Sequence, residues 1–168
     1  MTASHGDPES PDGACVDLIL WRHAEAVLAR EGLHDHDRAL TAKGERQAQR
    51  MAQWLNQRLA HSTRVLVSPA LRTQQTARHL ERSVRTVHEL APEASVDDLL
   101  KASQWPLCRE PVLVVGHQPT LGWVAARLMT GVEAPWSIKK GSVWWLRSRE
   151  REGVRQVVLH AVQVPELL

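Results

Sequence analysis

The chain has 168 residues, of which 43% are hydrophobic and 24% charged, a composition typical of a single soluble globular domain. Its 21 basic and 19 acidic residues leave a net charge of +2, too balanced for the clustered basic surface of a nucleic-acid-binding protein. No apolar run reaches the roughly 18 residues of a membrane span, no signal peptide is apparent, and the two cysteines lack a CxxC spacing, so we expect free thiols in the cytoplasm and no membrane contact.

Residues Met1–Ala14 are rich in Pro, Gly, Ser and Asp and show no apolar periodicity. We therefore expect a disordered leader there and a single domain over residues 15–168. The short apolar run Val16–Trp21 then predicts a buried strand. The polar, irregular segment Glu25–Leu40 predicts a loop.

A helix is predicted next, because apolar residues recur with helical spacing at Ala48, Met51, Ala52, Leu55 and Leu59. Thr41 can cap its first turn, in which Gly44 is tolerated. The run Arg64–Val67 predicts a second buried strand. Pro69 suits the first position of a following helix that we expect to continue to about Arg82.

The second half of the chain continues this alternation of strands and helices. The expected elements are a strand at Val84–Val87, a helix at Val96–Trp105, a strand at Val112–Val115, a helix at Thr120–Met129, and strands at Ser142–Leu146 and Val154–Val162 around a charged turn, Arg147–Gly153. Such alternation predicts an α/β three-layer sandwich, with a mainly parallel central sheet and helices on both faces. The last two strands should add an antiparallel edge near the C-terminus.

Polar residues that suit chemistry follow three of the predicted strands. The residues at or just beyond these strand ends are Arg22, His23, Ser68, Arg72 and His117. Ligands of open α/β sheets bind beyond the carboxyl ends of the strands. The sequence therefore predicts that two arginines and two histidines from three separate segments converge at one edge of the sheet.

This set of side chains suits a phosphate group. Two guanidinium groups offer planar pairs of donors that match phosphate oxygens and stay charged at any working pH. A neutral histidine between them can attack phosphorus and form a covalent phosphohistidine. A second histidine, if protonated, donates to the oxygens of the transition state, where electrostatic stabilisation dominates phosphoryl transfer. We expect a site for phosphate or another anion that needs no metal and no cofactor.

Four segments resemble motifs of the histidine phosphatase superfamily, also called the phosphoglycerate mutase-like family. Residues 20–25 (LWRHAE) resemble its RHG signature, residues 68–77 (SPALRTQQTA) its S-P-x-x-R-x-x-Q-T-A segment, and residues 116–119 (GHQP) its second histidine motif. Residues 38–44 (RALTAKG) are similar to the R-x-L-T-x-x-G stretch of the small SixA-type branch, the phosphohistidine phosphatases. The resemblance covers nearly all of the chain after residue 15, in the family's order.

The resemblance implies a role for each of the four central residues. His23 would be the nucleophile, and Arg22, Arg72 and His117 would bind the phosphoryl group. Ala24 departs from the signature, which commonly has Gly, although the SixA-type branch tolerates Ala at this position.

The general acid is less well defined by the sequence. Larger relatives take a Glu or Asp from an inserted segment to protonate the leaving group. Here Glu89 is the first candidate for this catalytic role and Asp35 the second. Because phosphohistidine has a good leaving group at neutral pH, a strong acid is not required.

Two other classes of function fit parts of the sequence. The segment His34-Asp35-His36-Asp37, extended by His23 and His117, could hold zinc or manganese. Adjacent His and Asp residues in a polar loop are more often exposed, however, and no further ligand has a characteristic spacing. A non-catalytic phosphate-binding module would have lost one of the four central residues, and none is missing.

A phosphatase of small metabolites and a mutase are alternatives within the enzyme class. Sites for small molecules enclose most of their ligand, and Val84–Pro111 is the only segment that could supply a cap. An open site instead admits a phosphohistidine displayed on a protein surface. We therefore expect a phosphohistidine-containing protein as substrate and partner, and the sequence leaves the oligomeric state open.

Overall fold

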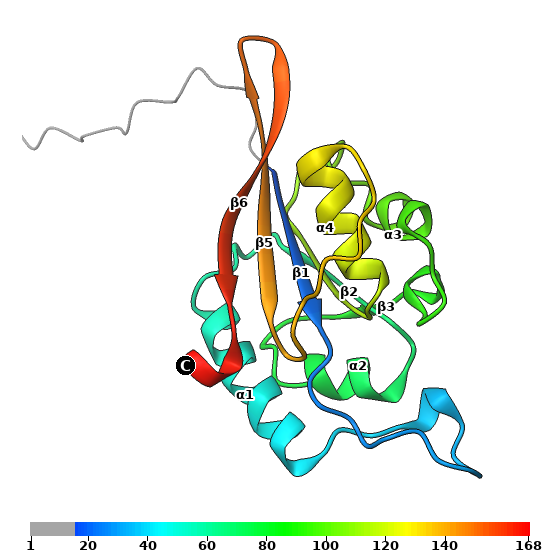
Figure 1. Ribbon diagram of the computed structural model, residues 1–168. Helices are drawn as coiled ribbons and strands as arrows, with labels where there is room; N and C mark the ends of the chain where they lie inside the picture. Colours follow the sequence, from blue (N-terminus) through cyan, green and yellow to red (C-terminus); the bar gives the residue numbers. More distant parts are fainter. Residues whose placement is uncertain (1–15) are drawn as a thin grey trace, which may run out of the picture.

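The computed structural model describes residues 16–168, and the leader expected over residues 1–14 lies outside them. The described residues form a six-stranded sheet, in the order β3-β2-β4-β1-β5-β6, between two layers of helices (Figure 1). The strands are β1 (Val16–Arg22), β2 (Arg64–Val67), β3 (Arg85–Thr86), β4 (Val112–Gly116), β5 (Val143–Arg151) and β6 (Val154–Gln163). The helices are α1 (Ala42–Asn56), α2 (Leu71–Ala77), α3 (Val96–Ser103) and α4 (Thr120–Thr130), with 3-10 turns at Asp35–Asp37, His88–Leu90 and Pro165–Leu167.

The pairing of the strands matches the predicted α/β class. Strands β1, β2, β3 and β4 pair in parallel, whereas β5 pairs antiparallel with both β1 and β6. The sheet is thus mainly parallel with an antiparallel pair near the C-terminus, and the predicted three-layer sandwich is confirmed. Within residues 16–168, no helix is both long enough and apolar enough to cross a bilayer.

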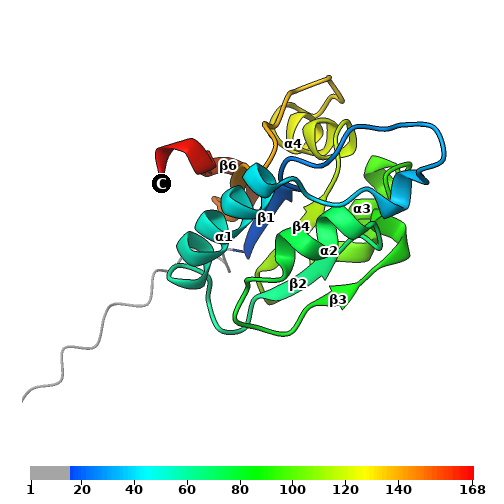
Figure 2. The same cartoon turned by 90° about the horizontal axis from the view of Figure 1, so that it is seen from below.

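The two faces of the sheet are covered by different helices, because successive side chains of a strand point to opposite faces. In β1, Leu18 and Leu20 pack with α3 and α4, while Ile19 and Trp21 pack with α1 and α2 (Figure 2). All four side chains are fully buried. Burial of each aliphatic one contributes about 1.5–3 kcal/mol. Strand β1 is therefore anchored by both helical layers up to the point where the reactive residues begin.

The start of α1 confirms the predicted cap but gives Gly44 a stricter role. The Gly44 N–H donates to Thr41 Oγ1 (3.0 Å), as expected of a helix cap. A β-carbon at Gly44 would overlap the backbone carbonyl oxygen of Glu25, so this turn of the helix lies directly against the loop that follows β1. Glycine is required here by that close approach.

The prediction of a helix from Pro69 to about Arg82 is wrong at both ends, since α2 spans only Leu71–Ala77. Ala70 keeps an extended backbone (φ −63°, ψ 141°), which delays the first helical turn. Beyond α2, the Asn56 side chain bonds to two backbone groups of the following loop. The Asn56 side chain of α1 therefore holds that loop in place.

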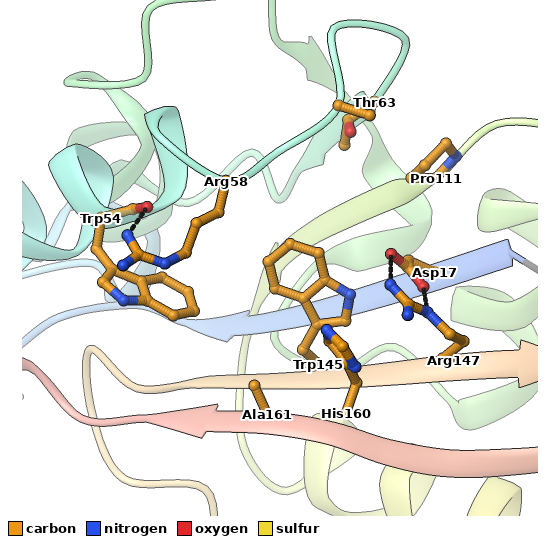
Figure 3. Close-up of a pocket in the computed structure, with 10 residues that line it drawn as sticks. Asp17, Trp54, Arg58, Thr63, Pro111, Trp145, Arg147, His160 and Ala161 are labelled. Carbon is orange, nitrogen blue, oxygen red and sulfur yellow. Dashed lines mark hydrogen bonds and ion pairs between the residues drawn. The ribbon is translucent and has the colours of Figure 1, made fainter. Parts of the chain in front are cut away.

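The predicted charged turn at Arg147–Gly153 is wrong over most of its length, because β5 continues through it. Only Glu152 and Gly153 form the turn, both with positive φ (52° and 75°), as a two-residue hairpin turn requires. In Figure 1 the hairpin projects beyond the rest of the sheet. Its charged residues therefore do not show the alternation of apolar and polar residues by which a half-buried strand is recognised in a sequence. Where β5 still pairs with β1, Arg147 Nε lies 2.6 Å from Asp17 Oδ1 (Figure 3).

Most other predicted elements agree with the structure to within two residues at either end. Helix α3 begins at a capping box, in which Ser95 Oγ accepts the Asp98 N–H (3.1 Å) and the Asp98 carboxylate accepts the Ser95 N–H (2.9 Å). It ends at Ser103 because Gln104 adopts a left-handed backbone conformation (φ 57°).

We expect the substitution Gly44→Ala to lower the free energy of unfolding by about 1–3 kcal/mol, because the added methyl group would overlap the Glu25 carbonyl and force the chain apart. Helix propensity alone would favour alanine by about 1 kcal/mol. A decrease in the free energy of unfolding therefore indicates the overlap, and an increase indicates helix propensity alone. Urea denaturation measures it. The control is Arg50→Ala on the exposed face of α1, which should stay within about 0.5 kcal/mol of the parent. A Gly44→Ala protein as stable as the parent would contradict the close approach.

Candidate active site

Three strand ends meet at one edge of the sheet. The pairing of β1 with β4 sets Arg22 opposite Gly116, and the His23 N–H donates to the Gly116 carbonyl (3.1 Å). Strand β2 pairs with the other side of β4, where the Ser68 N–H donates to the Val115 carbonyl (3.1 Å). The residues that follow these three strands are therefore neighbours, as the sequence predicted.

A cavity of about 270 Å³ opens at this edge. It is lined by Arg22, His23, Ala26, Arg38, Arg72, Pro92, His117, Gln118 and Lys140. The four residues that the sequence assigned to a phosphoryl group are all in this set, which also contains two further cations. None of the described residues that line the cavity is a carboxylate, so its charge favours an anion.

His23 is buried directly after β1, with only 7% of its surface exposed. Its Nδ1 lies 2.7 Å from the Ala24 carbonyl oxygen, which can only accept, so Nδ1 carries the ring proton. Burial, together with the charges of Arg72 and Arg22, lowers the pKa of His23 to about 4. At neutral pH the ring is therefore neutral, with its lone pair on Nε2, as a nucleophile requires.

Polar side chains of α1 and α2 hold the chain that follows His23. Thr76 Oγ1 in α2 accepts the Ala24 N–H (3.0 Å), and Gln47 Oε1 in α1 accepts the N–H of the next residue (3.0 Å). The Ala24 side chain, where the family signature commonly has Gly, is fully buried and packs with other small apolar residues. The site thus has room for its methyl group.

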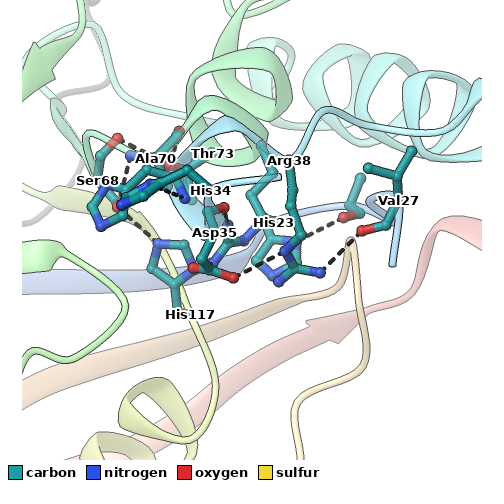
Figure 4. Close-up of polar contacts among 12 residues, drawn as sticks. His23, Val27, His34, Asp35, Arg38, Ser68, Ala70, Thr73 and His117 are labelled. Atoms are coloured by element: carbon teal, nitrogen blue, oxygen red, sulfur yellow. Dashed lines mark hydrogen bonds and ion pairs between the residues drawn. The ribbon is translucent and has the colours of Figure 1, made fainter. Parts of the chain in front are cut away.

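Arg72, in the first turn of α2, is only 3% exposed. Its Nη1 donates to the backbone carbonyl of Asp35 (2.7 Å), and its Nη2 donates to Asp35 Oδ2 (3.0 Å). Arg38 donates through Nε to Asp35 Oδ1 (2.9 Å) and through Nη1 to the Val27 carbonyl (3.0 Å; Figure 4). Asp35 therefore joins two arginines of the cavity and ties the loop after β1 to α2.

Three buried nitrogens of cavity-lining residues have no hydrogen-bond partner within residues 16–168: Arg22 Nε, Arg72 Nε and His117 Nδ1. Leaving a buried polar group unpaired costs about 1–3 kcal/mol. The three come from β1, from α2 and from the residue after β4, yet they belong to one cavity. A tetrahedral oxyanion in the cavity has the charge and the number of acceptor atoms to pair with all three.

His117 is 3% exposed, and its ring centroid lies 5.3 Å from that of His23. Its Nε2 shares a hydrogen bond with Ser68 Oγ (2.7 Å), and that hydroxyl oxygen also accepts the Ala70 N–H (3.3 Å). Burial lowers the pKa of His117, and the charges of His23 and Arg72 lower it further. At neutral pH the His117 ring is thus neutral, rather than the protonated donor considered from the sequence.

The structure does not bring the two acidic candidates to the cavity as proton donors. Glu89 is exposed on the turn His88–Leu90 and is not among the residues that line the cavity. Burial by itself would raise the pKa of Asp35, but the hydrogen bonds and charges of Arg72 and Arg38 hold that pKa below its ordinary value. An ionised carboxylate of this kind accepts hydrogen bonds and does not donate a proton.

The segment His34-Asp35-His36-Asp37 serves to place Asp35. The centroids of its two histidine rings lie 5.5 Å apart, and the Asp35 carboxylate forms ion pairs with Arg38 and Arg72. In the part of the chain that the structure describes, His, Cys, Asp and Glu side chains form no group of three or more that could hold a metal ion.

The sequence predicted no role for two cations of the cavity, Arg38 and Lys140. Arg38 belongs to the R-x-L-T-x-x-G segment, so this motif was a signal for it. Lys140 lies in the loop before β5, in which the Ile138 carbonyl accepts a hydrogen bond from Arg22 Nη1 (2.7 Å). No spacing or motif marks that loop, because its place depends on the antiparallel return of the chain beside β1.

Comparison with known proteins gives consistent matches in sequence. The sequence model of the histidine phosphatase superfamily (branch 1) matches residues 18–99. The phosphohistidine phosphatase SixA of Escherichia coli is 33% identical over 129 residues, which cover 71% of this chain and 78% of that protein. An uncharacterized protein of Picosynechococcus is 35% identical over 141 residues, 79% of this chain and 86% of that one.

The solved structures agree. A candidate phosphohistidine phosphatase SixA from Nakamurella superposes with a TM-score of 0.72 at 30% identity, over 92% of this chain and 98% of that one. A protein histidine phosphatase SixA complexed with tungstate gives a TM-score of 0.72 at 27% identity, over 90% and 99% of the two chains. The chain belongs to the histidine phosphatase superfamily, a class of phosphatases. Within it, these relatives support the SixA-type branch, so the resemblance read from the four motifs is confirmed.

The buried histidines predict that stability rises between about pH 5 and 6.5. Burial lowers the pKa of both His23 and His117, so below pH 6.5 the unfolded chain takes up protons that the folded chain does not. Each histidine should contribute up to ~1.4 kcal/mol per pH unit to this slope. Urea denaturation at a series of pH values should show a smaller slope for His117→Asn and an unchanged one for the surface variant Gln49→Ala. Equal slopes in all three proteins would contradict the effect of burial.

Proposed function

We propose that the protein hydrolyses phosphohistidine on other proteins, with the phosphoryl group carried transiently on His23. The observation that carries the proposal is the cavity itself. It combines a neutral histidine nitrogen with two guanidinium groups and a second histidine. Three buried nitrogens of these residues, Arg22 Nε, Arg72 Nε and His117 Nδ1, have no partner within residues 16–168. This chemistry needs neither a metal ion nor an organic cofactor.

In the first step, the lone pair on His23 Nε2 forms a bond to phosphorus while the P–N bond to the substrate histidine breaks. Arg22, Arg72 and His117 donate to the oxygens over which charge spreads in the transition state. A substrate imidazole that is protonated on its second nitrogen leaves as a neutral ring. In the second step, water attacks phosphorus, the bond to His23 breaks, and inorganic phosphate leaves.

The leaving group of a phosphohistidine suits a cavity that has no carboxylic acid among its described lining residues. Departure of an alkoxide from a sugar phosphate calls for a general acid. No carboxylate is among the described residues that line the cavity; Glu89 lies elsewhere on the surface, and Asp35 is held ionised by arginines. A phosphoramidate, which can leave without an acid from the enzyme, is therefore favoured over a phosphate ester.

The size of the cavity points to the same substrate. About 270 Å³ is below the range of roughly 300–1,000 Å³ that is usual for sites that bury a small molecule. The segment 84–111, the only one that could have supplied a cap, is occupied by β3, the turn His88–Leu90 and α3. A phosphohistidine on the surface of a protein does not need to be enclosed.

The relatives support this substrate class. The Escherichia coli relative is named a phosphohistidine phosphatase, and a SixA structure of the same fold is complexed with tungstate, a tetrahedral oxyanion like phosphate. We propose a histidine-containing phosphotransfer domain or carrier as the partner, and the cytoplasm as the place where the two meet.

The His23→Ala variant should lose turnover and the phosphoenzyme together, because no other neutral nitrogen has the same place at the end of β1. Wild-type protein mixed with a ³²P-labelled phosphohistidine protein and quenched in alkali should carry label that withstands alkali and is lost in acid. His61→Ala, on the surface, is the control and should be labelled like the wild type. Near-normal turnover by His23→Ala would rule out His23 as the nucleophile.

Arg72→Lys should lower kcat/KM by about 10²–10³, because one ammonium group cannot reproduce the two parallel donors of a guanidinium. Steady-state kinetics measure the loss, with Arg46→Lys on the exposed face of α1 as the matched control. Orthovanadate should inhibit the wild type competitively and Arg72→Lys much more weakly. Activity of Arg72→Lys within a few-fold of the wild type would argue against direct contact with the phosphoryl group.

A substrate panel tests the proposed specificity. The kcat/KM for a phosphohistidine-containing phosphotransfer domain should exceed that for sugar phosphates and other phosphate esters by orders of magnitude, since the cavity neither encloses an ester nor presents an acid to its leaving group. A metabolite turned over near ~10⁶ M⁻¹s⁻¹, with phosphohistidine proteins far slower, would overturn the substrate while leaving the enzyme class intact.

A further inference from the structure

A second and larger cavity, of about 510 Å³, lies at the opposite edge of the sheet from the active site. Its walls come from the end of α1, from residues that precede β2 and β4, and from β1, β5 and β6 (Figure 3). The amino ends of the parallel strands thus border this cavity, whereas their carboxyl ends border the active site. The two cavities share no lining residue.

Aromatic rings form one wall of this second cavity. The indoles of Trp54 and Trp145 meet edge to face, with ring centroids 6.2 Å apart and an interplanar angle of 83°. The His160 ring packs against the other side of the cluster, 5.6 Å from Trp145. Ring edges and faces of this kind contact a flat aromatic ligand favourably.

Two buried polar atoms at the cavity are unpaired. Trp145 and Thr63 are each only 7% exposed, and neither Trp145 Nε1 nor Thr63 Oγ1 has a hydrogen-bond partner within residues 16–168. Buried polar groups are nearly always hydrogen-bonded, so each of these atoms calls for a partner. An indole N–H can only donate, and the missing partner of Trp145 is therefore an acceptor.

The charge of the cavity favours an anion. The Arg58 guanidinium lies 4.7 Å from the centroid of the Trp54 ring and is exposed to solvent. Asp17 is the one carboxylate among the described lining residues, and it forms two hydrogen bonds with Arg147 (2.6 and 3.0 Å). The two arginines thus exceed the single carboxylate by one positive charge.

We propose that this cavity binds a small planar aromatic anion. The ring lies against Trp54 and Trp145, the negative group faces Arg58, and an acceptor atom of the ligand pairs with Trp145 Nε1–H. The volume is within the roughly 300–1,000 Å³ of pockets that enclose small molecules, and an apolar wall with a few polar groups is their usual composition. The site is independent of the phosphatase reaction proposed above.

The test uses the full chain, ¹⁵N-labelled, with indole-3-acetate as the probe and the neutral indole-3-acetamide as its comparison. The seven tryptophans give seven indole N–H signals in an NMR spectrum. Titration with the acid should shift the Trp145 signal, identified by its loss in Trp145→Phe, in a saturable manner. Excess inorganic phosphate, which addresses the active site, should leave this titration unchanged.

Matched variants separate the contributions of the cavity. Trp145→Phe keeps a ring but removes the donor, and should weaken binding about fivefold. Trp144→Phe is its control, because Trp144 points to the other face of β5, beside Trp136. Arg58→Gln should abolish the preference for the acid over the amide, whereas Arg50→Gln, within α1 and outside this cavity, should preserve it.

Three results would overturn the proposal. They are the absence of saturable binding by the acid, displacement of the acid by phosphate, and an acid-over-amide preference that survives Arg58→Gln. Because Arg58 is exposed, its variant tests the proposal even if Trp145→Phe fails to fold.

Discussion

The site depends on the parallel register of β1, β4 and β2. That register sets Arg22 opposite Gly116 and Val67 opposite Val115, so the residues after three strands arrive at one edge of the sheet. A slip of one residue would turn every side chain of a strand to the opposite face. In β1, such a slip would turn Leu18 away from α3 and α4 and turn Ile19 away from α1 and α2. The apolar pattern that stabilises the fold therefore also aims the polar residues that follow it.

The same geometry leaves three buried nitrogens of the site, Arg22 Nε, Arg72 Nε and His117 Nδ1, without a hydrogen-bond partner within residues 16–168. Burial disfavours the charged forms of Arg22 and Arg72, and it keeps His23 and His117 neutral. Groups held in place without partners do not need to reorganise when charge develops on a ligand, which is the basis of electrostatic stabilisation. The stability lost at such a site is a common cost of function, and the two apolar layers of the sheet offset it.

Local pattern and strand position were enough to predict the architecture and four of the residues that line the cavity, Arg22, His23, Arg72 and His117. Periodicity located the strands and α1, and the rule that ligands bind at strand ends grouped the two arginines with the two histidines. Contacts between distant segments account for what was missed. The loop that follows α2 is held by the Asn56 side chain of α1. The requirement for glycine at position 44 comes from the Glu25 carbonyl, and Asp35 is kept ionised by its ion pairs with Arg38 and Arg72. Glu89 was the nearest acidic candidate in the sequence, and the fold places it on the exposed turn His88–Leu90, where it does not line the cavity.

The ion pair between Asp35 and Arg72 has a consequence for product inhibition. Any anion that enters the cavity competes with a carboxylate that is already bound to the guanidinium. In the proposed reaction, a phosphoryl group on a protein can draw on additional contacts outside the cavity, but the inorganic phosphate formed from it has only the cavity. The competition therefore weighs more heavily on the product than on the substrate. An enzyme built in this way is blocked less readily by free phosphate than one whose arginines have no carboxylate partner.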